Sequence, residues 1–119
     1  MNEPLILIAD DSREIRRFLK ESILEPAGYR VRTAVDALSA IDMVRKLNPQ
    51  LVISDHQMDG MTGLELIQCM HQETPNLPVI LITSEGSEQL AVEALRAGAH
   101  DYLTKPFESE RLLSSIERA

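Results

Sequence analysis

The stretch that decides the fold is Leu5-Ile6-Leu7-Ile8-Ala9-Asp10-Asp11. Its first five residues are all apolar, which fits a short strand covered on both faces of its sheet, because a strand with one face in water alternates apolar and polar residues. Two carboxylates follow this run directly. The stretch therefore predicts a buried parallel strand whose carboxyl end carries acidic groups.

Three further runs end in residues that can handle a phosphate or a metal. Leu51–Ser54 runs into Asp55, Val79–Ile82 runs into Thr83-Ser84, and Tyr102–Thr104 runs into Lys105-Pro106. A more mixed run, residues 29–33, fits a strand nearer an edge of the sheet. The chain thus contains five candidate strands, and four of them end in a polar group.

Segments with helical spacing of apolar residues separate and follow these runs. The five apolar faces consist of Ile15, Phe18, Leu19 and Ile23; Ala37, Ala40, Ile41 and Val44; Leu64, Ile67 and Met70; Ala91, Ala94 and Leu95; and Leu112, Leu113 and Ile116. Strands that alternate with helices predict an α/β fold with a parallel sheet and right-handed crossovers. The smallest common solution is the flavodoxin-like, doubly wound (βα)5 fold with strand order 2-1-3-4-5. A chain of 119 residues suits one such domain, residues 1–119.

Composition excludes several classes of protein. The formal net charge of −7 argues against direct nucleic-acid binding by this segment. A single cysteine, Cys69, excludes an intrachain disulfide framework and fits a reducing compartment. No apolar run reaches the ~18 residues of a membrane span, and the N-terminus lacks the regions of a signal peptide. We therefore expect a cytoplasmic domain that does not contact a membrane.

The predicted strand order brings polar strand ends together at one edge. It places the first and third strands side by side, so Asp10, Asp11 and Asp55 become near neighbours. Three close carboxylates repel one another, and a hard divalent ion such as Mg²⁺ (or Mn²⁺) with oxygen ligands relieves that repulsion. Lys105 adds a positive charge and Thr83 a hydroxyl donor. Together these groups can bind and stabilise a phosphoryl group during in-line transfer.

Each residue also has a simpler interpretation when it is taken alone. Asp11 could cap the first helix, with Glu14 completing a capping box. Asp55 could be an ordinary turn residue, and Thr83-Ser84 could cap the helix that follows. The joint occurrence at successive strand ends favours a common site.

Five motifs carry a resemblance that covers essentially the whole chain. They are Ile8-Ala9-Asp10-Asp11-Ser12, Asp55-His56-Gln57-Met58, Met61-Thr62-Gly63-Leu64-Glu65, Ile82-Thr83, and Ala97-Gly98-Ala99-His100-Asp101-Tyr102-Leu103-Thr104-Lys105-Pro106-Phe107. Each motif is weak alone, but their order and spacing are specific. The chain resembles the receiver domain of a two-component response regulator.

The resemblance implies a phosphorylation-dependent signalling switch rather than an enzyme that turns over many substrates. It implies that Asp55 accepts a phosphoryl group from a histidine kinase or a histidine phosphotransfer protein. Asp10, Asp11, Asp55 and the backbone carbonyl of Gln57 would hold Mg²⁺. Thr83 and Lys105 would contact the phosphoryl oxygens, and the Lys105-Pro106 bond is cis in similar proteins.

The resemblance also implies how the signal is relayed and tuned. Thr83 would move toward the phosphoryl group and Tyr102 would turn inward, which remodels the surface of the fourth helix, fifth strand and fifth helix. Gln57 and Glu85 resemble positions that tune the lifetime of the phosphorylated state. The chain departs from the family at Asp59, where proline is common. We expect this acidic residue to loosen the loop or to alter charge repulsion toward a phosphodonor.

Two other functions are open to the same architecture. A Mg²⁺-dependent phosphohydrolase with an aspartyl-phosphate intermediate usually has a second acid two residues after the nucleophile, where this chain has Gln57. A flavin or nucleotide module needs a Gly-rich phosphate loop after the first strand, where this chain has Asp10-Asp11. The expected partners are a phosphodonor protein and an output domain or target protein, with dimerisation on phosphorylation as a further hypothesis. The chain could be a free-standing receiver or the N-terminal part of a longer regulator.

Overall fold

Five parallel strands form one sheet in the computed structural model, which describes residues 3–84 and 86–119. The strands are β1 Leu5–Ala9, β2 Arg30–Ala34, β3 Leu51–Asp55, β4 Val79–Thr83 and β5 Asp101–Thr104. They lie in the order β2-β1-β3-β4-β5. The predicted doubly wound topology is therefore confirmed, and the predicted strand limits differ from the observed ones by about one residue.

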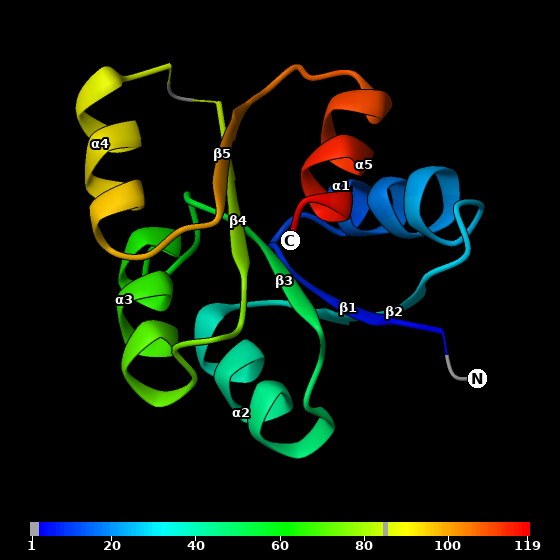
Figure 1. Cartoon of the computed structure of the whole chain (residues 1–119), viewed down its shortest axis with the longest axis horizontal. Helices are drawn as coiled ribbons and strands as arrows, with labels where there is room; N and C mark the ends of the chain where they lie inside the picture. The colour runs from blue at the N-terminus through cyan, green and yellow to red at the C-terminus, as the bar shows by residue number, and fades with distance from the viewer. Residues whose placement is uncertain (1–2, 85) are drawn as a thin grey trace.

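Helices cover both faces of this sheet (Figure 1). They are α1 Arg13–Arg17 with its continuation η1 Phe18–Leu24, α2 Ala37–Leu47, α3 Gly63–Glu73, α4 Glu88–Arg96 and α5 Ser109–Glu117. The first helical segment, α1–η1, and α5 lie on one face, whereas α2, α3 and α4 lie on the other. Among the described residues, no helix has the length and apolar character needed to cross a membrane.

Burial on two faces explains why the central strands β1, β3 and β4 are almost entirely apolar. In β1, Ile6 and Ile8 belong to the core beneath η1 and α5, while Leu7 and Ala9 belong to the core beneath α2 and α3. All five residues of β1 are buried. Because parallel strands need crossover connections that place helices on the sheet, such runs contain no position for a polar residue. The first polar residues therefore appear at the strand ends.

The first helix differs from the regular α-helix that the sequence predicts. Its second half, η1, is π-helical, and the Glu25 N–H donates to the Lys20 carbonyl, five residues back, at 2.9 Å. The residues that η1 buries are Leu19, Ile23 and Leu24. Phe18, which the helical spacing placed on the buried face, is 52% exposed. It lies at the flank of that face and lines a shallow apolar cavity beside Pro106 and Phe107.

The fourth helix also buries a narrower face than its sequence pattern suggests. Leu90 and Ala94, one turn apart, are its buried residues. Leu95 is 54% exposed because it lies about 100° further round the helix than Ala94. The expectation that Leu95 faces the core was therefore wrong.

Candidate functional site

Three carboxylates converge at the carboxyl edge of the sheet. β1 and β3 are direct neighbours, with Ala9 opposite Ser54, so the residues that follow them are brought together. Asp10, Asp11 and Asp55 each offer an oxygen atom, and these oxygens lie within 4.8 Å of one another. Asp10 and Asp55 are buried, whereas Asp11 is exposed. The site thus has two acids in its floor and one at its opening.

Asp10 is the most constrained of the three acids, with only 1% of its surface exposed. Its Oδ1 accepts a hydrogen bond from the Ser12 N–H at 2.8 Å, and its carbonyl oxygen accepts one from Arg16 Nη1 at 2.7 Å. The buried Oδ2 accepts no hydrogen bond from any described residue. The pKa of Asp10 is raised to about 6, mainly by burial; the charges of Asp55 and Asp11 also raise it, whereas the Ser12 hydrogen bond and the charge of Lys105 lower it.

Lys105 supplies the counter-charge to the two buried acids. Its Nζ donates to Asp55 Oδ1 at 3.2 Å and lies 4.0 Å from Asp10 Oδ2. Lys105 directly follows β5, and its own N–H donates to the Thr83 carbonyl at 2.7 Å. This backbone bond ties the end of β5 to the end of β4. The Lys105-Pro106 peptide bond is cis.

Two hydroxyl groups at the end of β4 contact the loop that follows Asp55. The buried Thr83 is the last residue of β4, and its Oγ1 donates to Gln57 Oε1 at 3.3 Å. Ser84 Oγ donates to the same Gln57 oxygen at 3.3 Å. Thr83 is therefore placed beside the loop that follows the candidate nucleophile. The structure gives no test of the predicted metal contact of the Gln57 carbonyl, which stays a prediction.

The two remaining predicted residues differ in what the structure says of them. Tyr102 is half-buried on β5, opposite Leu81 of β4, and packs against the core cluster under α2, α3 and α4. It therefore lies one strand away from Thr83 and two strands away from Asp55. Glu85 lies outside the described residues.

The structure corrects the capping interpretation of the polar strand ends. Ser12 is the N-cap of α1, and its hydroxyl accepts from the Ile15 N–H at 3.3 Å. Asp11 is therefore not the helix cap that one interpretation made it. The residue that caps α4 is likewise Ser87 rather than Thr83 or Ser84. Asp11, Thr83 and Ser84 are therefore not engaged as helix caps, and their side chains lie at the carboxyl edge of the sheet.

A cavity of about 420 Å³ opens beside the acids and is lined by Asp11, His56, Gln57, Met58, Asp59 and Thr62. Nearby, the first residue of α3, Gly63, packs tightly against the end of β3. A Cβ atom on Gly63 would lie 2.6 Å from Leu81 Cδ1 and closer still to the Asp55 carbonyl oxygen. Only glycine permits this approach of the helix start to the end of β3.

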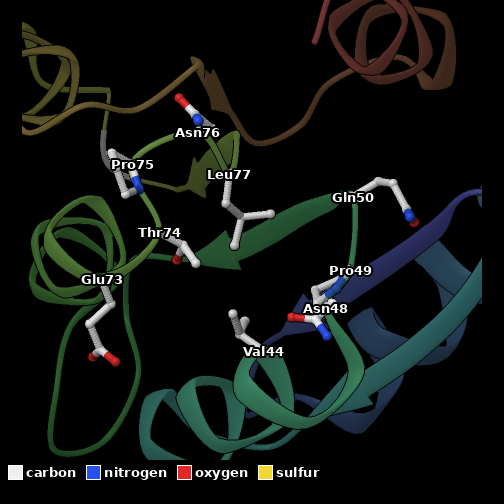
Figure 2. Close-up of a pocket in the computed structure, with 9 residues that line it drawn as sticks. All are labelled: Val44, Asn48, Pro49, Gln50, Glu73, Thr74, Pro75, Asn76 and Leu77. Atoms are coloured by element: carbon white, nitrogen blue, oxygen red, sulfur yellow. The ribbon is translucent and has the colours of Figure 1, made fainter.

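A second cavity, of about 450 Å³, lies at the opposite edge of the sheet (Figure 2). Its lining comes from Val44 and from the loops before β3 and β4, residues 48–50 and 73–77. It has one carboxylate, Glu73, and that group is bound to Arg45 at 2.8 Å. This cavity lacks the converging acids that phosphoryl chemistry requires, and ligands of open parallel sheets bind at the other edge.

Sequence reasoning missed two contributors to the site. Arg16 is not among the predicted site residues, yet it donates to the Asp10 backbone carbonyl. Ser12 was quoted only as part of a motif, yet it both caps α1 and donates its N–H to Asp10 Oδ1. A serine directly before a helical segment is a recognised N-cap signal, whereas the Arg16 contact has no signal in the sequence.

The residues present fit a divalent cation. The donor set consists of carboxylate oxygens, which hard cations such as Mg²⁺ prefer. The raised pKa of Asp10 and its buried Oδ2, without a hydrogen bond from the described residues, indicate an unbalanced negative charge. A cation held between Asp10, Asp11 and Asp55 would balance it.

Comparison with known proteins agrees with this geometry. Residues 6–117 match the family model described as the response regulator receiver domain, and the chain belongs to this family. Receiver domains are signalling switches of two-component signal transduction, and they generally bind Mg²⁺ at an acidic pocket. The predicted family and fold are confirmed.

Individual relatives place the chain among bacterial response regulators. It is 43% identical over 114 residues to the C4-dicarboxylate transport transcriptional regulatory protein DctD of Pseudomonas aeruginosa, covering 96% of this chain and 24% of that protein. It is 38% identical to the transcriptional regulatory protein FixJ of Bradyrhizobium diazoefficiens, covering 96% of this chain and 55% of that protein. The chain thus spans only a quarter to about half of these relatives.

Solved receiver domains superpose closely on this chain. The receiver domain of NtrX from Brucella abortus has a TM-score of 0.87 at 39% identity and covers 95% of both chains. A CheY-like receiver domain protein from Methanospirillum hungatei has a TM-score of 0.89 at 30% identity, covering 98% of this chain and 93% of its own.

Proposed function

We propose that this receiver domain accepts a phosphoryl group on Asp55 in a Mg²⁺-dependent reaction. The observation that carries the proposal is the lysine that bridges two buried acids, with Lys105 Nζ 3.2 Å from Asp55 and 4.0 Å from Asp10. A partly buried ammonium between carboxylates neutralises part of their charge, so a phosphoryl group with several negative oxygens can approach.

The residues of the chain divide the work of the transfer. An Asp55 carboxylate oxygen attacks phosphorus, the bond from phosphorus to the donor's imidazole nitrogen breaks, and that nitrogen keeps the electron pair and takes up a proton. Lys105 and the Thr83 hydroxyl would bind the oxygens of the transferred group. Asp10, Asp11, Asp55 and the Gln57 carbonyl would hold Mg²⁺, which when bound balances the charge that accumulates on the phosphoryl oxygens.

The response then passes from Thr83 to Tyr102. Phosphorylation adds negative charge and acceptor oxygens beside Thr83, which attracts its hydroxyl. Tyr102 lies one strand further on, half-buried against the core under α4. A move of Thr83 toward Asp55 would open space for the Tyr102 ring and alter the α4–β5–α5 surface. That surface would meet the output domain or target protein, or a second phosphorylated copy.

The phosphohydrolase alternative is not favoured by the site. Such an enzyme needs an acid two residues after the nucleophile to protonate the leaving group and activate water. Gln57 occupies this position, and its amide oxygen is engaged by the Thr83 and Ser84 hydroxyls. An amide cannot serve as this general acid or base.

The test is phosphorylation by phosphoramidate, with intact mass as the readout. We expect one phosphoryl group per chain with Mg²⁺, none with EDTA, and none for Asp55→Asn. Asp42→Asn is the matched control, because Asp42 is exposed on α2 and pairs only with Lys46 at 2.9 Å among the described ion pairs. Full labelling of Asp55→Asn, or rapid continuous phosphate release, would refute the proposal.

A further inference from the structure

An acidic side chain stands at the opening of the phosphoacceptor cavity. Asp59 is exposed and lines the same cavity of about 420 Å³ as Asp11, which is also exposed. The other lining residues are His56, Gln57, Met58 and Thr62, so no Lys or Arg lines this cavity. A ligand in this cavity lies against Asp59 and beside Asp11, whose carboxylate has an oxygen within 4.8 Å of one of Asp55.

The site's basic residues do not offset these two charges. Lys105 is committed to the buried pair, at 3.2 Å from Asp55 and 4.0 Å from Asp10. Arg16 is bound to the Asp10 carbonyl at 2.7 Å. Among the described ion pairs, none includes Asp11 or Asp59. Asp59 is therefore the carboxylate of this cavity that neither a described ion pair nor the predicted Mg²⁺ site neutralises.

We propose that Asp59 makes this opening an electrostatic filter that disfavours small, doubly charged phosphodonors. The proposal rests on the function proposed above. A small donor carries its full charge through the cavity and is repelled by Asp59. A protein donor presents one phosphorylated imidazole and can bring its own cationic groups against Asp59. Asp59 is thus a specificity-determining residue, whereas Asp55 remains the nucleophile.

The experiment compares two small donors that transfer the same group. With acetyl phosphate, an Asp55 oxygen attacks phosphorus, the bond to the bridging oxygen breaks, and acetate leaves with the electron pair. With phosphoramidate, the phosphorus–nitrogen bond breaks and ammonia leaves after the nitrogen has taken a proton. Acetyl phosphate is doubly charged near neutral pH, and phosphoramidate carries one net negative charge. The two donors differ in leaving group as well as in charge, so the rate of each variant is compared with the wild-type rate for the same donor.

We expect Asp59→Asn to increase the second-order rate constant for phosphorylation by acetyl phosphate about two- to fivefold at low ionic strength. This is the effect of removing one partly screened charge. The gain should be smaller with phosphoramidate, and both gains should vanish at about 1 M salt, where the Debye length is about 3 Å. Each variant is measured at saturating Mg²⁺. Asp59→Glu should behave as wild type, and Asp42→Asn controls for net charge.

Equal rates for Asp59→Asn and wild type, or a gain that ignores salt, would overturn the filter. A gain in Asp59→Pro without one in Asp59→Asn would also overturn it, because loop stiffness and not charge would then be responsible. Absence of labelling in every variant, wild type included, would overturn the proposed function and with it this inference.

Discussion

Replacing Asp10 with asparagine tests the electrostatics of the site without touching the nucleophile. The change removes the charge of a side chain that is 1% exposed, but it keeps an oxygen that can accept the Ser12 N–H bond. Without a metal, Asp10→Asn should therefore be more stable than wild type at neutral pH. It should also lose stabilisation by Mg²⁺.

The magnitude follows from the pKa of Asp10, which rises from 3.8 to about 6 in the folded chain. The pKa of Asp10 thus differs by about two between the folded and unfolded chain. At about 1.4 kcal/mol for one pKa unit, the buried charge costs about 3 kcal/mol of unfolding free energy. Because the folded state binds the proton more tightly than the unfolded chain, wild-type stability should fall as pH rises from about 4 to about 6. The full cost of the buried charge applies above pH 6.

The assay is urea unfolding in EDTA at pH 5.0 and at pH 7.5, with and without Mg²⁺. The difference between wild type and Asp10→Asn isolates this one group from others that titrate over the same range. We expect the variant's advantage to be larger at pH 7.5 and to disappear when Mg²⁺ saturates wild type. An Asp10→Asn protein less stable than metal-free wild type at pH 7.5 would refute the reasoning.

Three further substitutions test other parts of the account. Gly63→Ala should cost about 1–3 kcal/mol of unfolding free energy, because its Cβ would lie 2.6 Å from Leu81 Cδ1; an unchanged urea midpoint would contradict the close approach. Burial alone would raise the pKa of Asp101, but hydrogen bonds from Arg111, Ser115 and the Tyr102 N–H bring it to about 2. The ionised carboxylate therefore stabilises the fold above pH 4, and this stabilisation is lost as pH falls toward 2. Asp101→Asn should therefore cost about 1–2 kcal/mol at pH 7 and little near pH 2, as measured by urea unfolding; equal costs at both pH values would argue against this. Tyr102→Ala should be phosphorylated at the wild-type rate yet lose the change in α4 amide chemical shifts that phosphorylation causes, and retention of that change would remove Tyr102 from the relay.

The fold was predictable because its strands are buried on both faces. Runs such as Leu5–Ala9 are apolar on both faces, which indicates buried strands, and the helices between the runs indicate that the strands are parallel. What could not be predicted depends on how far each helix turns on the sheet. Phe18 and Leu95 follow the helical spacing, yet they lie just beyond the buried faces of η1 and α4. The π-helical geometry of η1 has no signal in residue spacing.

The sequence predicted which acidic residues form the site better than it predicted the hydrogen bonds among them and their neighbours. The convergence of Asp10, Asp11 and Asp55 follows from topology alone, since β1 and β3 are neighbours. The bond from Arg16 to the Asp10 carbonyl depends on the rotamer of a long side chain, which spacing does not specify. The sequence offered Asp11 as a cap of the first helix, but the structure gives this role to Ser12, whose hydroxyl accepts a hydrogen bond from the Ile15 N–H.

The most direct test of the central claim is to locate the phosphoryl group on the chain. Phosphorylated protein is reduced with borohydride, which converts an acyl phosphate to an alcohol, and the modified residue is then identified by peptide mass spectrometry. The account predicts modification at Asp55 alone, with Asp10 and Asp11 unmodified in the same sample. Modification at Asp10 or Asp11 instead of Asp55 would contradict it.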